Sequence, residues 1–213
     1  MERENGHSTN DGVKRSSVIE AARGYLARGW APVPIPPMMK KPILKGWTSL
    51  RLQEGDLTKR FRNSANIGLI LGEASGWLVD VDLDCDEAIE LADQYLPPTP
   101  AITGRPNAPR SHRWYIAKGA STEQHKDPRT NDMIVELRST GGQTVVGPSI
   151  HPDDGDVYEI LDGEPATVPE PMLAACVAAL AKAIVKLRYG VSPPCARKVK
   201  KVERPYCSLK TCD

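Results

Sequence analysis

The sequence predicts an α+β fold that forms one domain of ordinary size. Segments with strand-type and helix-type patterns follow one another in mixed order, which is typical of α+β domains. The chain has 213 residues, of which 40% are hydrophobic, so it can bury a core of its own. Its 19 prolines indicate that many loops connect the elements.

Composition divides the chain into four expected segments. Residues 1–15 are polar, and we expect a disordered N-terminal tail there. A folded domain is expected at 16–168, followed by an alanine-rich C-terminal helix at 169–190. Residues 191–213 are basic and contain prolines, so we expect a flexible tail or linker.

The first expected elements are a helix and an edge strand. Ser16 or Ser17 caps a helix that runs to Arg28, because apolar residues then recur at helical spacing. Residues 30–35 form a short strand, and its prolines place it at the edge of a sheet. A loop that carries three lysines follows at 36–46.

Two helices and two strands are expected next. Asp56 caps a short helix, and apolar runs predict strands at 66–71 and 77–83. Asp84 then begins a second helix, because Asp84 and Glu87 have the spacing of a capping box before an apolar stretch.

Further strands are expected in the second half of the domain. Residues 104–111 form a loop that leads into a strand at 112–116, and another strand lies at 133–137 after a polar stretch. Residues 143–146 and 157–161 are expected to pair with each other, antiparallel, around an Asp-Asp-Gly turn.

Charge and cysteine content limit the classes of function. The net charge is +1, so no nucleic-acid footprint is visible over the whole chain. Residues 40–62 are basic and 80–93 acidic, which suits either a metal-and-phosphate site or a solvated surface. The 5 cysteines are scattered, which favours a reducing compartment over a disulfide framework. Without an apolar run of ~20 residues or a signal peptide, we expect a cytoplasmic protein with no membrane association.

An Asp-Val-Asp sequence inside an apolar strand is the strongest chemical signal. Asp80 and Asp82 are two residues apart, so both point to the same face of the strand, with backbones roughly 6–7 Å apart. Buried charges are costly unless they are paired or bind a metal, and oxygen ligands favour Mg²⁺ or Mn²⁺. Simple loop capping is the alternative. A calcium loop is excluded, because Cys85 and Leu91 replace its required glycine and glutamate.

Three further residues suggest phosphate chemistry. His112 opens a strand, Glu136 lies inside an apolar strand, and Arg138 shares the face of Glu136. Carboxylates on two strands together with cationic donors are what nucleotidyl transfer by two metal ions requires. Taken alone, His112 is also consistent with an ordinary hydrogen-bonded histidine, and Glu136 with a solvent-facing strand residue.

The order of these elements resembles the bifunctional DNA primase/polymerase N-terminal domain of the archaeo-eukaryotic primase superfamily, over roughly residues 17–165. Asp80-Val81-Asp82 is similar to the family's first motif, His112 to the histidine of its second, and Glu136 to the acid of its third. Further similar pieces are Gly29-Trp30-Ala31-Pro32, Lys40-Lys41-Pro42, Ala65-Asn66-Ile67-Gly68-Leu69 and Gly147-Pro148-Ser149.

The resemblance implies a site and an activity. Asp80, Asp82 and Glu136 would bind Mg²⁺ or Mn²⁺, His112 would contact the phosphates of a nucleotide, and Arg138 and Lys41 would be secondary phosphate contacts. The implied fold is an α/β unit packed against a mixed, RNA-recognition-like sheet. The implied activity is addition of a dNTP or NTP to a 3′-hydroxyl on a DNA template, with a replicative helicase as a partner.

Two other functions remain open at this point. Asp-x-Asp also holds the metal in nucleotide-sugar glycosyltransferases, although this leaves His112 and Glu136 unexplained. A non-catalytic replication or mobile-element protein that retains the fold is the other alternative. It is supported by Arg110, which stands where the family has a small residue, in the altered loop 104–111.

Overall fold

The computed structural model describes residues 10–61 and 65–190, with side chains from Val18 onward. Two mainly antiparallel sheets are flanked by helices, which confirms the expected α+β class. The helices are α1 (Asn10–Ala27), α2 (Leu57–Arg60), α3 (Asp86–Tyr95) and α4 (Glu170–Tyr189), with 3-10 turns η1 (Trp47–Ser49), η2 (Glu54–Asp56) and η3 (Glu73–Ser75). The strands are β1 (Ala31–Ile35), β2 (Asn66–Ile70), β3 (Leu78–Leu83), β4 (Ile102–Arg105), β5 (Ala108–Ile116), β6 (Glu123–Lys126), β7 (Met133–Arg138), β8 (Gln143–Val146) and β9 (Ala166–Thr167).

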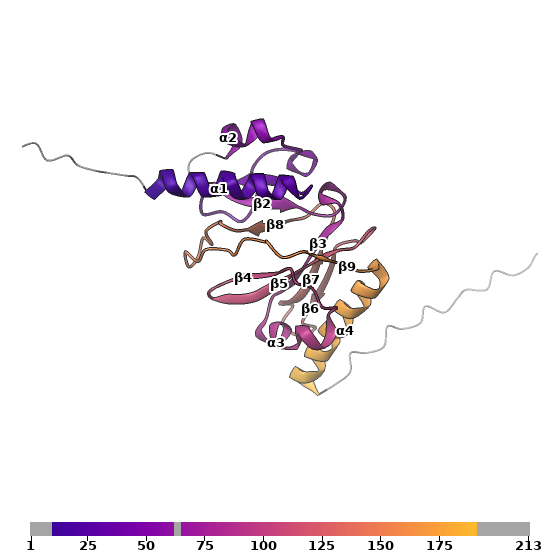
Figure 1. Cartoon of the computed structure of the whole chain (residues 1–213). Helices are drawn as coiled ribbons and strands as arrows, with labels where there is room; N and C mark the ends of the chain where they lie inside the picture. Colours follow the sequence, from indigo (N-terminus) through magenta and orange to yellow (C-terminus); the bar gives the residue numbers. More distant parts are fainter. Residues whose placement is uncertain (1–9, 62–64, 191–213) are drawn as a thin grey trace, which may run out of the picture.

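The smaller sheet has the strand order β1-β2-β8. Every residue of β2 is buried, as expected for a central strand, and β1 is the edge strand that its prolines predict. Side chains from α1 and α2 cover this sheet, with Tyr25, Leu57 and Phe61 in a shared core. Figure 1 shows α1 and α2 with this sheet at one end of the molecule.

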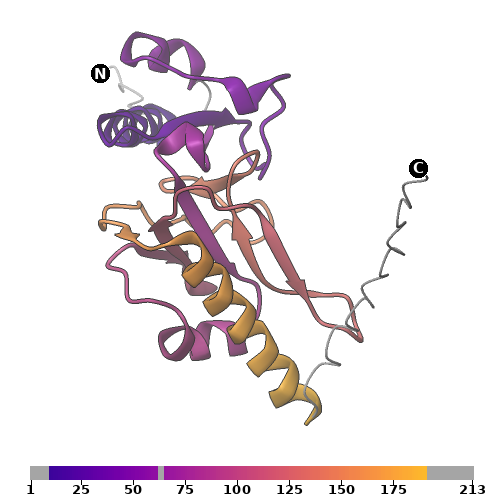
Figure 2. The same cartoon turned by 90° about the vertical axis from the view of Figure 1, so that its right-hand side faces the viewer.

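The larger sheet has the order β4-β5-β3-β7-β6, with β9 beside β5. Its central strand β3 alternates apolar and acidic residues. Val79, Val81 and Leu83 pack on the helix side, in a core that α3 and α4 complete. The long helix α4 runs along this side of the sheet (Figure 2). Asp80 and Asp82 therefore occupy the opposite face.

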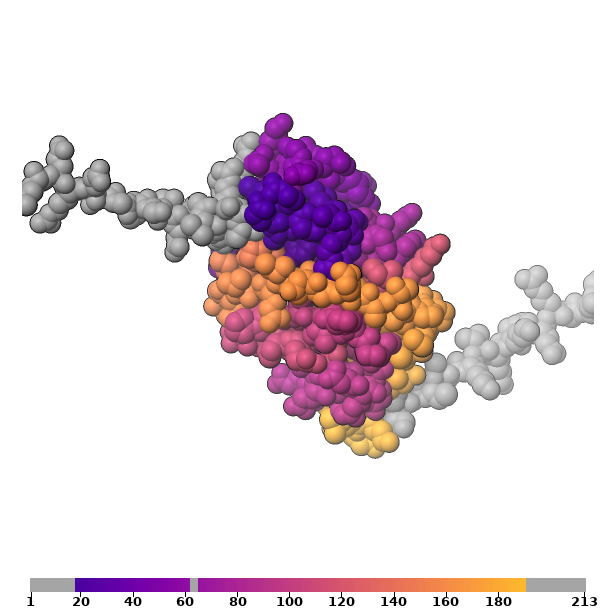
Figure 3. Space-filling view, in the orientation of Figure 1, coloured from indigo at the N-terminus to yellow at the C-terminus, as the bar shows by residue number. Residues whose placement is uncertain are grey.

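The segment between β8 and α4 returns to the N-terminal helix. The Tyr25 hydroxyl donates a hydrogen bond to the carbonyl of Gly147, and Arg28 donates to the carbonyls of Leu161 and Gly163. Figure 3 shows this orange segment lying against the indigo helix α1. These contacts hold the segment between β8 and α4 against the N-terminal part of the fold.

The structure corrects the expected starts of two helices. Helix α1 begins at Asn10 rather than Ser16 or Ser17, so residues 10–15 are helical; residues 1–9 and 191–213 lie outside the described residues. Once a helix has nucleated, extending it by one residue costs little free energy, since each added residue gains a hydrogen bond. Helix α3 begins at Asp86, after the N-cap Cys85. The prediction of a capping box at Asp84 is therefore wrong. The backbone N–H of Asp84 donates to the carbonyl of Ile134 and so continues the hydrogen-bond ladder of β3.

Two expectations about the second half are also wrong, and one strand there was not expected. The loop at 104–111 is a β-hairpin formed by β4 and β5, and part of the polar stretch after residue 116 forms strand β6. Residues 143–146 do not pair with 157–161. Strand β8 instead pairs with β2, and Val157 forms only a single bridge to Ile150. A buried central strand such as β2 needs partners on both edges, and this long-range requirement overrides the nearby turn.

None of the helices in the described part of the chain is both long and apolar enough to span a membrane.

Candidate active site

One row of side chains crosses the larger sheet on the face away from α3 and α4. Asp82 of β3 lies opposite His112 of β5 on one side and Glu136 of β7 on the other. The same register extends the row to Thr103 in β4 and Gln124 in β6. The antiparallel pairing thus brings an acid, a histidine and a second acid from three strands to one place.

The next row places Asp80 at the junction of the two sheets. Asp80 lies between Trp114 of β5 and Arg138 of β7, and its side chain is fully buried. The hydroxyl of Thr144, from strand β8 of the smaller sheet, donates a 2.7 Å hydrogen bond to its carboxylate. The indole N–H of Trp114 donates to Thr103, so this tryptophan is held inside the protein and does not face a ligand.

His112 connects the two aspartates. Its Nδ1 lies 3.0 Å from Asp80 Oδ2 and 3.3 Å from Asp82 Oδ1. Burial alone would lower the pKa of His112, but the carboxylates of Asp80 and Asp82 raise it to about 9. The ring is therefore protonated at neutral pH, and its Nδ1–H donates to the carboxylate of Asp80.

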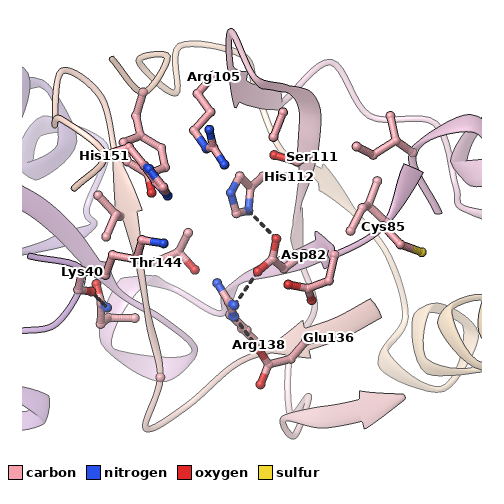
Figure 4. A pocket seen from close by; sticks show the side chains of 18 of the residues that line it. Lys40, Asp82, Cys85, Arg105, Ser111, His112, Glu136, Arg138, Thr144 and His151 are labelled. Carbon is pink, nitrogen blue, oxygen red and sulfur yellow. Dashed lines mark hydrogen bonds and ion pairs between the residues drawn. The ribbon is translucent and has the colours of Figure 1, made fainter. Parts of the chain in front are cut away.

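Arg138 contacts all three predicted acids. Its Nε donates to Glu136 Oε2 at 2.7 Å, its guanidinium forms an ion pair with Asp82, and its Nη1 lies 3.9 Å from Asp80 Oδ2. In Figure 4 the guanidinium lies between Asp82 and Glu136. Burial opposes its charge, but Asp82 and Asp80 raise the pKa of Arg138 above its ordinary value. The other carboxylate oxygen of Glu136 accepts a hydrogen bond from Gln124.

The carboxylates of this site are crowded and partly desolvated. Burial raises the pKa of Asp82, although His112 and Arg138 both act to lower it. Burial and then the charge of Asp82 raise the pKa of Asp84 to about 7. An all-oxygen donor set with excess negative charge is chemically suited to a hard divalent cation.

These side chains line an open pocket of about 660 Å³. Asp82, Asp84 and Glu136 form an acidic wall, and Lys40, Lys41, Arg105 and His151 form a basic one; Figure 4 shows Arg105 and His151 across the pocket from Glu136. Arg105 pairs with Asp154 and Asp156, and His151 with Asp154. Lys40 pairs with Asp153, so within the described residues Lys41 is the member of the basic wall that has no ion pair.

The structure brings most of the predicted site residues to this pocket. Asp82, His112, Glu136, Arg138 and Lys41 line it. Asp80 is not part of its lining, because it is buried beneath His112 and Arg138.

Sequence reasoning missed other residues of the site, which are Asp84, Gln124, Thr144, Arg105 and Tyr158. Asp84 continues the alternation of Asp80 and Asp82, a signal that the apparent capping box obscured. No sequence signal singles out Thr144, because its role depends on contact between two sheets.

Among the described residues, no group of three or more histidine, cysteine, aspartate or glutamate side chains is arranged as a ready metal site. The position of Arg138 explains this, since its guanidinium separates the carboxylates that would have to share an ion. All three acids contact one partly exposed cation, so the donor set accommodates positive charge at this position.

Comparison with known families identifies a match that covers most of the chain. A family model described as the N-terminal domain of bifunctional DNA primase/polymerase matches residues 22–171. The matched region contains both sheets and every residue of the pocket. Comparison with curated proteins finds no match.

Proposed function

Because the chain belongs to the family of bifunctional DNA primase/polymerase N-terminal domains, we propose that it is a DNA-dependent nucleotidyltransferase that uses two metal ions to add a dNTP or NTP to a 3′-hydroxyl. The family acts on DNA and nucleotides and generally uses divalent metals. The observation that carries the proposal is the cross-strand row in which Asp82 lies between His112 and Glu136, with Asp80 in the adjoining row.

Asp80, Asp82 and Glu136 are the proposed metal-binding residues, and Mg²⁺ or Mn²⁺ fits their oxygen donors. When bound, such ions favour the ionised 3′-hydroxyl and neutralise charge on the departing pyrophosphate. Asp82 and Glu136 face the pocket directly. Asp80 supports the site from below, where Thr144 and His112 fix its carboxylate.

His112, Arg138 and Lys41 are the proposed phosphate contacts. Nδ1 of His112 is engaged by Asp80, so the protonated ring has its Nε2–H left to donate to a phosphate oxygen. Lys41 lines the pocket and has no ion pair or hydrogen bond within the described part of the chain. A triphosphate would thus meet three cationic groups on the walls of one pocket.

The DNA strand is proposed to cross a surface that we call the basic strip, formed by residues 38–45 with Lys59 and Arg60. The strip exposes four large apolar side chains, those of Met38, Met39, Ile43 and Leu44. Lys40 and Lys41 line the catalytic pocket, whereas Lys45, Lys59 and Arg60 line a second hollow of about 510 Å³. Single strands are bound by such combinations, because the cations contact phosphates and the apolar groups contact bases.

A replicative helicase is the proposed partner, as implied by the usual domain company of the family. The proposal of a helicase partner rests on the family resemblance, and the test of the activity does not depend on it.

Extension of a primed DNA template tests the proposal. With Mn²⁺ or Mg²⁺ and either dNTPs or NTPs, we expect the wild-type chain to extend the primer. We expect Asp80→Asn with Asp82→Asn, or Glu136→Gln alone, to reduce extension by at least about 100-fold, because charge stabilisation at the reacting centre is lost. Asp162→Asn is the matched control, since Asp162 is an exposed aspartate outside the pocket.

Two results would contradict the assignment. Extension that survives in the double variant would show that these acids do not carry the chemistry. Metal-dependent binding of nucleotide without incorporation on any template would instead favour the non-catalytic alternative.

A further inference from the structure

We propose that Arg138 is a built-in counter-cation of the carboxylate cluster, defined as Asp80, Asp82 and Glu136, and that divalent metal binds only by displacing it. The inference rests on the proposed function, because it takes the cluster as the metal site. It concerns a competition between an arginine and the metal, which the proposed function does not require.

The carboxylate cluster requires positive charge close to it. Three carboxylates lie close together, and Asp80 is fully buried. Buried carboxylates are tolerated only when they are neutralised and hydrogen-bonded. Arg138 contacts all three, at 2.7 Å to Glu136 and 3.9 Å to Asp80 and by an ion pair to Asp82, whereas protonated His112 contacts only the two aspartates.

Each carboxylate oxygen of the cluster has a partner within the protein. Oε1 of Glu136 accepts from Gln124, Oδ2 of Asp80 accepts from Thr144, and Oδ1 of Asp82 faces His112. The oxygens directed at Arg138 are Oε2 of Glu136 and Oδ2 of Asp82. A metal ion held by Asp82 and Glu136 would need these oxygens, which the guanidinium of Arg138 occupies.

The side chain of Arg138 borders the open pocket, into which it could move. Arg138 is a pocket-lining residue, and 26% of its side chain is exposed. Its guanidinium can therefore turn from the carboxylates toward the pocket without unfolding the strand. Displacement would deliver a positive group to the space where the phosphates of a nucleotide are proposed to bind, so metal binding and nucleotide binding would favour each other.

This role predicts that removal of Arg138 changes the metal affinity in an unusual direction. If Arg138 only supports the carboxylates, its removal weakens metal binding or leaves it unchanged. If Arg138 competes for them, its removal tightens metal binding, because the metal no longer has to displace a cation. The two roles are therefore separated by the direction of one change in affinity.

Titration of the chain with Mn²⁺, followed by the electron paramagnetic resonance signal of free Mn²⁺, measures this affinity without nucleotide or DNA. We expect Arg138→Gln to bind Mn²⁺ about 5- to 150-fold more tightly than wild type, the usual range of a coupling between two ligands. Arg51→Gln is the control, since Arg51 is an exposed arginine that does not line the pocket and donates to the carbonyls of Thr48 and Leu50; the Mn²⁺ affinity of this variant should equal that of wild type.

A second measurement uses the wild-type chain and so does not depend on the folding of a variant. The Nε–H resonance of Arg138 in ¹⁵N-labelled protein should shift when Mg²⁺ is added, because its hydrogen bond to Glu136 is broken. Equal or weaker Mn²⁺ binding in Arg138→Gln, or an unchanged Arg138 resonance at saturating Mg²⁺, would overturn the inference. Failure of wild type to bind Mn²⁺ at all would contradict the proposed function as well.

Discussion

Asp80 and Asp82 are two residues apart on one strand but have different surroundings. Strand periodicity places them on the same face, as the sequence predicts. Strand periodicity does not predict how deeply each aspartate is buried. For Asp80, burial depends on contact with β8 of the other sheet. Asp80 accepts a hydrogen bond from Thr144 and lies beneath His112 and Arg138, so it does not line the pocket, whereas Asp82 does.

Thr144 should therefore be a positioning residue for the carboxylate cluster. Replacing it by valine keeps the shape but removes the 2.7 Å hydrogen bond to Asp80. Loss of a hydrogen-bond donor to a buried carboxylate destabilises a protein by about 1–3 kcal/mol. We therefore expect Thr144→Val to lower the free energy of unfolding by that amount in urea titrations. Primer extension should fall as well.

Thr167→Val is the control for Thr144→Val, because Thr167 is exposed and makes no side-chain hydrogen bond within the described residues. Equal stability of the two variants would show that the Thr144 hydroxyl does not support Asp80.

Single residues of the site are predictable to the extent that their chemistry is local. Glu136 is an acid within an apolar strand, and Arg138 follows it on the same face, so both are visible in the sequence. Asp84 resembles a helix cap in the sequence, because a local pattern cannot show where a strand ends. Gln124 belongs to the cross-strand row only because β6 pairs with β7.

Elements with a strong pattern of their own are predicted better than elements that depend on a partner. The strands predicted at 66–71, 77–83 and 133–137 overlap β2, β3 and β7. Strand β6 is polar and forms because the edge of β7 is available to it. Pairing partners are set by the whole sheet, which explains the error at 143–146.

The contact between α3 and α4 gives an element-scale prediction with a pH dependence. Arg188 of α4 donates two hydrogen bonds to Glu87 of α3, at 2.9 and 2.8 Å, and these lower the pKa of Glu87 to about 2. A carboxyl whose folded-state pKa lies below the unfolded value of 4.5 stabilises the fold above pH 4.5. That contribution is lost as the pH falls toward 2.

We therefore expect Glu87→Gln to lower the melting temperature at pH 7 by roughly 2–4 °C, the effect of about 1 kcal/mol in a chain of this size. The difference from wild type should shrink as the pH is lowered from 4.5 toward 2. Glu90→Gln, an exposed glutamate of the same helix, should have no such effect. A difference that stays constant with pH would contradict the role of the Glu87 charge.

At the scale of the whole molecule, the site lies where the chain crosses twice between the sheets. The link from β2 to β3 and the link from β7 to β8 meet at Gly72 and Thr140. A side chain at Gly72 would lie 2.0 Å from Thr140 Oγ1, and its φ of +71° also favours glycine. The packing of these two links holds β8 close to the larger sheet, where Thr144 donates to Asp80. No local pattern predicts a contact between segments this far apart.

The charge of the whole molecule is nearly balanced, at +1, but it is separated in space. Acids gather at one wall of the pocket, whereas the basic strip leads away from the other wall. In the described part of the chain, no ion pair or hydrogen bond engages the side chains of Lys41, Lys45, Lys59 and Arg60. A surface of unpaired cations can release counterions when it binds a polyanion.

Binding of a single-stranded oligonucleotide should therefore depend on the basic strip more than on net charge. We expect Lys45→Glu with Lys59→Glu to weaken binding, measured by fluorescence anisotropy, and to reduce the slope of log affinity against log salt by about 0.7 for each phosphate that the variant no longer neutralises. Lys118→Glu with Lys182→Glu changes the net charge equally at exposed lysines outside both hollows. If both double variants bind with the same reduced affinity, the DNA responds to overall charge and the basic strip is not its path. If only the first binds more weakly, the template reaches the carboxylate cluster across the part of the basic strip that contains Lys45 and Lys59.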